Sequence, residues 1–390
     1  MRDRIYQWLQ FKRYNWKNYD YSLVIVVFFL TLISSYILSL VQENRFSLTR
    51  QIASIIMGLF VIAFFSLVDY HDLCLYIPLL YLVTTIMAAA TKLSPLGTDL
   101  STDSYRWLDF KVITFQPSEV CKIIVILSLA AFFNRAMEKG IQSYKNFFLA
   151  CLIAAVPTFF ILIQSDLSSS IVIIAVLIIM LACSGIGYKI IGSIAAIVVP
   201  IVVGVIWYSM QSKTHGIFRG YQWERIDAWL HPEGHELGLM YQQNNSILSI
   251  ASGKLYGKLL EGTDDVRNYN TVSVRDSDFI WTPISEEFGF VGCLLILILL
   301  SVIIIKSFRA AKSAKDYMGM MIAVGIGAML TFQTFFNIGV TTSLLPNTGL
   351  PLPFLSNGLS SLLSNMMTIG ILLNIGIQPN RGSNAGLDFR

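Results

Sequence analysis

The chain has 390 residues, of which 55% are hydrophobic and only 13% are charged. Soluble domains carry about 25% charged residues, so this composition excludes an ordinary soluble domain and predicts a protein embedded in a membrane. The net charge is +4.

Long apolar runs predict the membrane-spanning helices. A helix that crosses a bilayer needs about 20 mostly apolar residues, and ten runs approach that length. In chain order they are Tyr21–Val41, Gln51–Val68, Leu73–Ala90, Pro117–Phe133, Phe147–Gln164, Ser168–Gly185, Ile190–Met210, Trp281–Ile305, Tyr317–Val340 and Leu352–Ile377. The sequence therefore predicts an all-α polytopic membrane protein, with residues 1–390 forming a single membrane domain of about ten transmembrane helices.

Lysine and arginine gather on one side of these spans, and short cytoplasmic loops are enriched in both residues. The basic side comprises the N-terminal segment, the loops after the fourth and eighth spans, and the C-terminal segment, whereas the opposite short loops hold fewer cations. The residues on the basic side are Arg2, Arg4, Lys12, Arg13, Lys17, Arg135, Lys139, Lys145, Lys306, Arg309, Lys312, Lys315, Arg381 and Arg390. We expect both termini in the cytoplasm, where these cations account for the net charge without a nucleic-acid partner.

The pair Glu119 and Lys122 is the clearest set of ionisable residues inside a predicted span. The two residues are three positions apart and therefore share one face of a helix, and their charges should face the protein interior or a wet cavity. Pro117 opens this helix, and Ser118 could cap it. Lys122 could neutralise a phosphate or pair structurally with Glu119, and the chemistry of the residues leaves both interpretations open.

Carboxylates also stand at the ends of two other spans. We expect Asp166 to cap the sixth span. Glu286 and Glu287 lie just inside the eighth span, where a carboxylate can bind a metal ion or favour the helix N-terminal dipole. The structural role is the favoured interpretation for both glutamates.

One long polar segment, residues 211–278, separates the seventh span from the eighth and is expected outside the cell. It ends at Asp278, which is followed at once by Phe279, Ile280 and Trp281. An acidic residue at this boundary lies where bilayer-held lipid meets water, so chemistry is expected there. Asp278 could also serve as the N-cap of the eighth span, and its residue type alone favours that structural role.

Five blocks of residues follow one another along these spans. They are Arg106-Trp107-Leu108 with Phe115-Gln116-Pro117-Ser118-Glu119 and Lys122; Gln164-Ser165-Asp166-Leu167; Arg225–Gly238 with Tyr241-Gln242; Asp278-Phe279-Ile280 with Glu286–Phe290; and Asn337-Ile338-Gly339 through Leu345–Phe354. In this order they resemble the blocks of the RodA/FtsW/SpoVE (SEDS) family, the polytopic proteins of bacterial shape, elongation, division and sporulation. The short N-terminal segment and tail favour a RodA-like member.

The resemblance implies a peptidoglycan glycosyltransferase of the bacterial plasma membrane that polymerises lipid II, the undecaprenyl-pyrophosphate-linked disaccharide-peptide. Such a substrate needs a lipid-facing groove for its tail, cations for its diphosphate and a base for the acceptor hydroxyl. One carboxylate suffices as that base, because the transfer inverts an α-linked donor into a β-1,4 link. The family's partner is a class B penicillin-binding protein. A divalent cation such as Mg²⁺ is compatible with the diphosphate, although the sequence shows no protein-only metal cage.

The resemblance also implies roles for particular residues. Asp278 matches the external aspartate that is considered catalytic in the family, and it is expected to act as the general base. The substrate-binding residues are expected to be Arg50, Gln116, Ser118, Glu119 and Lys122. Arg50 matches a basic residue that opens the second span, although an arginine at a membrane boundary is usually an anchor whose charged end reaches water.

The sequence departs from the family pattern at two turns. The family's FxSYGGSS turn has Asn357 and Leu359 here, and its GSGGL.GKG loop has Lys254. Leu359 and Lys254 lack the freedom of glycine to adopt a positive φ, so both turns are expected to differ from the family's.

Two other functions stay open at this stage: a flippase or transporter of lipid-linked precursors, and a non-catalytic scaffold for a transpeptidase. A transporter would place its essential charges along a path through the bilayer, whereas a polymerase needs an essential carboxylate at the outer face. Asp278 fits the polymerase, and Glu119 with Lys122 would suit either.

Overall fold

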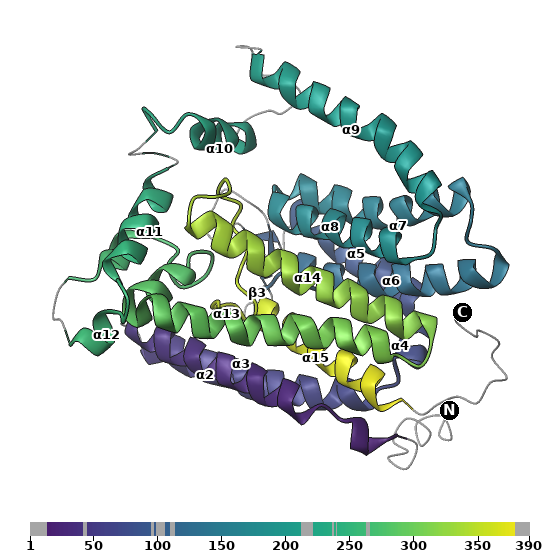
Figure 1. Ribbon diagram of the computed structural model, residues 1–390, viewed down its shortest axis with the longest axis horizontal. Helices are drawn as coiled ribbons and strands as arrows, with labels where there is room; N and C mark the ends of the chain where they lie inside the picture. Colours follow the sequence, from purple (N-terminus) through teal and green to yellow (C-terminus); the bar gives the residue numbers. More distant parts are fainter. Residues whose placement is uncertain are drawn as a thin grey trace.

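The computed structural model describes most of the chain as a bundle of helices (Figure 1). The described residues are 14–41, 45–94, 97–98, 106–109, 114–211, 221–235, 238, 240–262 and 266–378. Part of the basic side falls outside these ranges, namely the cations before residue 14 and after residue 378. Parts of the polar segment 211–278, including residues 212–220 and 263–265, also lie outside them.

Long apolar helices dominate the described part of the chain, and seven of them are long and apolar enough to cross a membrane. These seven are α2 (Tyr21–Val41), α3 (Arg45–Leu67), α6 (Pro117–Lys139), α7 (Tyr144–Ile163), α13 (Trp281–Ser313), α14 (Tyr317–Thr341) and α15 (Leu359–Ile377). Three shorter apolar helical stretches are α5 (Ile77–Leu93), α8 (Leu167–Cys183) and residues Tyr188–Ile197 of α9 (Tyr188–Gln211). Each predicted span overlaps one of these helices, so the all-α membrane class is confirmed.

The predicted third and tenth spans begin at the wrong residues. The third is divided at Tyr76 into the short helix α4 (Tyr70–Leu75) and α5, because a proline in the first turn of α5 lacks the N–H that would continue a preceding helix. The tenth begins at Leu359 rather than Leu352. Phe354 and Gly358 have φ angles of 64° and 159°, which a right-handed helix does not allow.

The bundle has a buried centre and a lipid-exposed periphery. The most apolar stretches of α15, α14 and α6 are 83%, 72% and 67% buried inside the protein, whereas those of α13 and α7 are only 22% and 28% buried. The helix α15 packs along α3, and α14 packs against α13, α8 and α6. Polar side chains of the central helices therefore face protein rather than lipid.

The polar segment between α9 and α13 is itself folded. It contains the helices α10 (Tyr221–Leu230), α11 (Tyr241–Ser252) and α12 (Lys258–Glu261), followed by the 3₁₀ helix η3 (Asn268–Thr271). Figure 1 shows these helices gathered at one end of the bundle. The helix α11 packs against α13 and η3, so the segment covers one end of the membrane helices.

A small antiparallel sheet lies just before α6. Its strands are β1 (Gly97–Thr98), β2 (Trp107–Asp109) and β3 (Thr114–Phe115), in that order, with Leu108 paired to both Gly97 and Phe115. Strands of two or three residues are too short to show an alternating pattern in the sequence. The sheet ends at Phe115, directly before Gln116, a residue of the site described next. A second 3₁₀ helix, η2 (Trp16–Asn18), precedes α2.

Candidate functional site

Asp278 lies where the polar segment meets the loop between α14 and α15. Its side chain is partly exposed, whereas its neighbour Phe279 is fully buried. The amide of Asn337 on α14 donates one hydrogen bond to the Asp278 carbonyl at 2.8 Å and another to the Leu350 carbonyl at 2.6 Å. This one side chain therefore fixes both stretches of backbone relative to each other.

The α14–α15 loop also holds the two residues before Asp278. Ser356 donates a hydrogen bond to the Ser277 carbonyl at 2.6 Å. Asn357 bonds Asp276 twice, from its backbone N–H to the carbonyl at 2.8 Å and from its amide to the carboxylate at 3.1 Å. The departure at Asn357 from the family pattern therefore has a structural use, because it anchors the turn that carries Asp278.

Asp278 does not cap the eighth span, so that alternative is wrong. The helix α13 begins at Trp281, its N-cap is Ile280, and no side chain caps it. With no capping role, the carboxylate of Asp278 is available for another purpose.

Charges of both signs act on the Asp278 carboxyl group. Burial raises its pKa, the nearby cations Arg106 and Arg225 lower it, and the carboxylates Asp166 and Asp276 raise it, with a net pKa of about 6. A carboxyl group with this pKa is ionised near neutral pH and is still a stronger proton acceptor than an ordinary aspartate. Two arginines beside one carboxylate can also bind an anionic group that is brought next to it.

Both arginines are held by backbone carbonyls from other parts of the chain. Arg225 on α10 donates to the Asn347 carbonyl at 3.0 Å. Arg106, which precedes β2, donates to the Ser165 carbonyl at 2.6 Å, and its buried Nε atom has no protein acceptor among the described residues. A guanidinium has five N–H donors, so Arg106 keeps hydrogen-bonding capacity for a ligand.

The buried Ser118 and Asp166 and the half-buried Gln116 form a polar cluster between α6 and α8, called the buried cluster below. Ser118 Oγ donates to Asp166 Oδ2 at 2.9 Å, and Gln116 Nε2 donates to the same oxygen at 3.4 Å. The other Asp166 oxygen accepts from the Ser169 backbone N–H at 3.1 Å, which confirms Asp166 as the cap of α8. Ser118 is not a cap, because the N-cap of α6 is Gln116 and Ser118 lies one residue inside the helix.

The pair Glu119 and Lys122 lies at the end of the same cluster. Lys122 Nζ is 2.8 Å from Glu119 Oε1, and both side chains are 1% exposed. Ser364 on α15 donates to the other Glu119 oxygen at 3.4 Å. Burial raises the pKa of Asp166, but Arg106, Ser169 and Lys122 together outweigh it, so the net shift is downward. The Lys122 charge thus helps to keep Asp166 ionised.

Arg50 is exposed, unlike Ser118, Glu119, Lys122 and Asp166. Arg50 lies in α3 with an exposed side chain, and its carbonyl accepts a hydrogen bond from Ser54. Its neighbour Gln51 is buried and donates to Ser34, which donates to the Leu355 carbonyl. The start of α3 therefore lies beside the α14–α15 loop, at the same end of the bundle as Asp278.

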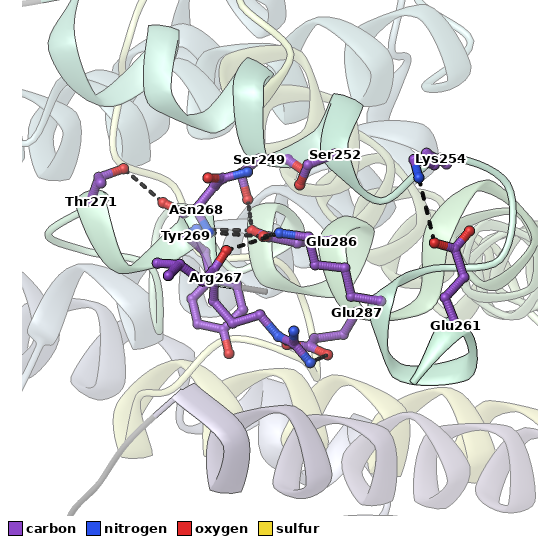
Figure 2. A network of polar contacts seen from close by, with 12 residues as sticks. Ser249, Ser252, Lys254, Glu261, Arg267, Asn268, Tyr269, Thr271, Glu286 and Glu287 are labelled. Carbon is purple, nitrogen blue, oxygen red and sulfur yellow. Dashed lines mark hydrogen bonds and ion pairs between the residues drawn. The ribbon is translucent and has the colours of Figure 1, made fainter. Parts of the chain in front are cut away.

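Glu286 and Glu287 hold the polar segment onto α13 (Figure 2). Glu286 is fully buried and is 2.5 Å from Lys258 Nζ, and it accepts the backbone N–H groups of Asn268 and Tyr269 at 2.8 and 2.9 Å. Glu287 pairs with Arg267 at 2.8 Å. The structural interpretation of both glutamates is confirmed, although their partners are loop cations and amides rather than the helix dipole.

The turn at Lys254 keeps the conformation that glycine would favour. Lys254 has a φ of 47°, a left-handed conformation that costs a residue other than glycine about 1 kcal/mol. Leu359 requires no such conformation, since it is the first residue of α15 and the preceding Gly358 has the positive φ. Position 254 therefore has a left-handed backbone without a glycine, and the expected difference from the family's turn stays a prediction.

Metal ligands do not gather within the described residues, where no three His, Cys, Asp or Glu side chains are placed to hold an ion together. The carboxylates that act on Asp278 are Asp166 and Asp276, and both raise its pKa. Arg106 and Arg225 act on the same carboxylate, so these two guanidinium groups are the ones beside Asp278 that can bind an anionic ligand. A divalent cation would fit here only together with ligands from a bound diphosphate.

Three features of this site were not predicted from the sequence. Arg106 and Arg225 stood within the sequence blocks quoted above, yet neither was expected to act on Asp278. The bond between Ser118 and Asp166 joins residues 48 positions apart. Ser118 and Asp166 lie at the ends of apolar runs, which was the available signal for their contact, because such ends meet at one face of a bundle; the positions of Arg106 and Arg225 carried no such signal.

Comparisons with known proteins agree with one another. The family model described as "Cell cycle protein", which spans FtsW, RodA and SpoVE, matches residues 18–381. The peptidoglycan glycosyltransferase MrdB of Escherichia coli strain K12 is 32% identical over 84% of both chains. A chain from a peptidoglycan synthase complex that coordinates polymerization and crosslinking has a TM-score of 0.76 at 22% identity, covering 92% of this chain and 97% of that chain. The rod shape determining protein RodA of Thermus thermophilus has a TM-score of 0.67 at 21% identity, covering 93% and 98%.

Proposed function

Because this chain belongs to the FtsW, RodA and SpoVE family, we propose that it is a peptidoglycan glycosyltransferase, which polymerises lipid II into β-1,4-linked glycan strands for cell-wall elongation, division or sporulation. The observation that carries the proposal is the carboxyl group of Asp278, which has a pKa of about 6 and lies under the influence of Arg106 and Arg225. The reaction needs a base for the acceptor hydroxyl and cations for the departing diphosphate, and Asp278 with its two arginines offers both.

In the proposed reaction Asp278 acts as the general base. It takes the proton from the acceptor 4-hydroxyl while that oxygen forms a bond to the anomeric carbon of the donor. The bond from this carbon to the pyrophosphate breaks, and its electron pair leaves with undecaprenyl pyrophosphate. Attack from the face opposite the leaving group inverts the configuration, so one carboxylate suffices.

Arg106 and Arg225 bind the diphosphate in this proposal. Arginine suits phosphate because its planar guanidinium donates two parallel hydrogen bonds. The developing negative charge of the leaving group would be stabilised by the same cations. Mg²⁺ would accompany the diphosphate and further neutralise it, so a chelator is expected to slow the reaction.

The buried cluster has a positioning role. Lys122 is 1% exposed and paired to Glu119, so it contacts a diphosphate only if this pair opens. Its charge instead supports the ionised Asp166, which accepts hydrogen bonds from Ser118 and Gln116. The exposed Arg50 would contact the anionic part of the lipid substrate at the start of α3.

The orientation of the chain follows from the distribution of cations. We propose that both termini are cytoplasmic and that the folded segment from α10 to η3 is outside, in the bacterial plasma membrane. Cysteines introduced at two exposed positions, Thr271→Cys and Ser313→Cys, test it in a Cys183→Ser background, because Cys183 is also exposed. A membrane-impermeant thiol reagent added to intact cells should label position 271 and spare position 313, and the reverse pattern would contradict this orientation.

A class B penicillin-binding protein is the proposed partner, which would crosslink the glycan strands. The similar fold of a chain in a peptidoglycan synthase complex supports this partner.

The test of the proposed function is direct. The purified full-length chain, alone and with such a partner, is incubated with lipid II, and the glycan products are separated by size. We expect glycan strands longer than the input disaccharide. Transport of lipid II across vesicles without any glycan product would indicate a flippase, and a lack of both activities under either condition would indicate a scaffold.

A further inference from the structure

A cavity of about 430 Å³ lies at the end of α13 that is remote from Asp278. Its walls come from the chain around η2, the last turns of α13 and the last turns of α15, and they include Asn18, Asp20, Lys306, Arg309, Ser313 and Lys315. At 1.5 Å per residue, Lys306 is roughly 37 Å along α13 from Trp281. The cavity is therefore separate from the site at Asp278, and its volume falls in the range of about 300–1,000 Å³ that is usual for ligand sites.

The walls of this cavity carry more positive than negative charge. Lys306 Nζ contacts both carboxylate oxygens of Asp20, at 2.6 and 2.9 Å, so these two charges neutralise each other. Arg309 and Lys315 are exposed, and neither has an ion-pair partner within the described part of the chain. Two unneutralised cations thus face the cavity together with the polar groups of Asn18 and Ser313. An anion would complete the charge balance.

The aromatic residues beside the cavity indicate its depth in the membrane. Tyr14, Trp16, Tyr19 and Tyr21 form a continuous series of ring contacts, with centroid separations of 6.3, 6.0 and 4.8 Å. Trp16 and Tyr21 are exposed. Tryptophan and tyrosine gather where the hydrocarbon of a bilayer meets the headgroups, and Asn18 and Asp20 of the cavity wall alternate with these rings. The cavity therefore lies at headgroup depth.

We propose that this cavity binds the phosphate headgroup of an anionic phospholipid. Basic pockets between membrane helices bind such headgroups, and here Arg309 and Lys315 would bind the phosphate while the acyl chains lie against the apolar faces of α2 and α13. Lys306 is paired with Asp20, so it forms part of the cavity wall but adds no net positive charge. The bound lipid would join the N-terminal segment to the ends of α13 and α15.

Thermal unfolding of the full-length protein in mixed micelles tests this proposal. Phosphatidylglycerol is titrated into the micelles, with phosphatidylcholine and inorganic phosphate as separate additives. The test variant is Arg309→Gln/Lys315→Gln. The matched control is Lys139→Gln/Lys145→Gln, which removes two exposed cations at the loop between α6 and α7, outside the cavity.

We expect phosphatidylglycerol to raise the Tm of the wild type and of the control, and phosphatidylcholine to leave both unchanged. Each juxtamembrane cation contributes about 1 kcal/mol toward anionic lipid, so the double test variant should need about 30-fold more phosphatidylglycerol for the same shift. An unchanged titration in the test variant, or an equal loss in the control, would overturn the proposal. If inorganic phosphate alone raised the Tm as much as phosphatidylglycerol does, the ligand of the cavity would be free phosphate, and the proposal of a bound phospholipid would be wrong.

Discussion

The carboxyl group of Asp278 lies against the backbone of Gly349, so that a Cβ atom added to Gly349 would stand 3.0 Å from Asp278 Oδ2. Gly349 also has a φ of 75°, a conformation in which a side chain is strained. A side chain at position 349 would therefore press on the carboxylate of the proposed base, and the glycine leaves that space open.

Gly349→Ala should lower lipid II polymerisation by about tenfold. A displacement of about 1 Å at a reacting group can cost about 10²-fold, and this contact requires a smaller one. Gly262→Ala is the matched control, because Gly262 has a φ of 62° with no atom within 4 Å of an added Cβ. Equal rates for the two alanine variants would show that the approach to Asp278 has no effect on catalysis.

The rate should depend on the ionisation of Asp278. With a pKa of about 6, the fraction of ionised base falls below that pH, so kcat/KM should decline toward tenfold per pH unit at lower pH. Arg225 lowers this pKa. Arg225→Gln should therefore move the decline of kcat/KM at low pH to higher pH. Arg225→Lys keeps the charge and should leave this decline near its wild-type position. If kcat/KM declined at the same pH in the wild type and both variants, the Arg225 charge would not lower the pKa of Asp278.

Lys122→Met should abolish polymerisation while the protein still inserts into the membrane. The substitution leaves Glu119 buried without its partner, which costs about 3–5 kcal/mol of stability. Glu119→Gln/Lys122→Met removes both charges and should recover most of the lost Tm without recovering activity. Activity near the wild-type level in the double variant would reduce the pair to a structural ion pair.

Two lysines of the polar segment can be compared, Lys258 and Lys254, and Figure 2 labels Lys254 with its partner Glu261. Lys258 pairs with the buried Glu286 at 2.5 Å, whereas Lys254 is 71% exposed and lies 3.6 Å from Glu261. Lys258→Met should lower stability by about 3 kcal/mol, and Lys254→Met should change it by less than about 1 kcal/mol. Similar Tm values for the two variants would indicate that the buried pair does not hold the polar segment onto α13.

The membrane helices were predictable because each one needs an apolar run long enough to cross the bilayer. The pairing of Glu119 with Lys122 was also predictable, since residues three apart share a helix face. The predicted start of the tenth span at Leu352 was wrong, because the apolar residues continue there but the backbone turns at Phe354 and Gly358.

Contacts between distant segments could not be predicted in the same way. Lys258 and Glu286 are 28 positions apart, and Gln243 on α11 donates to the Val340 carbonyl 97 positions away. Periodicity describes a single helix and gives no information about which loop covers it. The folding of the polar segment therefore emerges only from the structure, together with the placement of Arg225 near Asp278.

The rate of lipid II polymerisation by Asp278→Asn tests the central claim most directly. Asparagine keeps the size of the side chain but cannot accept the proton, and Asp278 caps no helix, so the variant should fold, reach the membrane and bind lipid II. General-base catalysis contributes about 10²- to 10⁴-fold, and we expect a loss of at least about 10²-fold at a matched protein level. Glycan strands formed at a rate close to that of the wild type would show that the base is another residue.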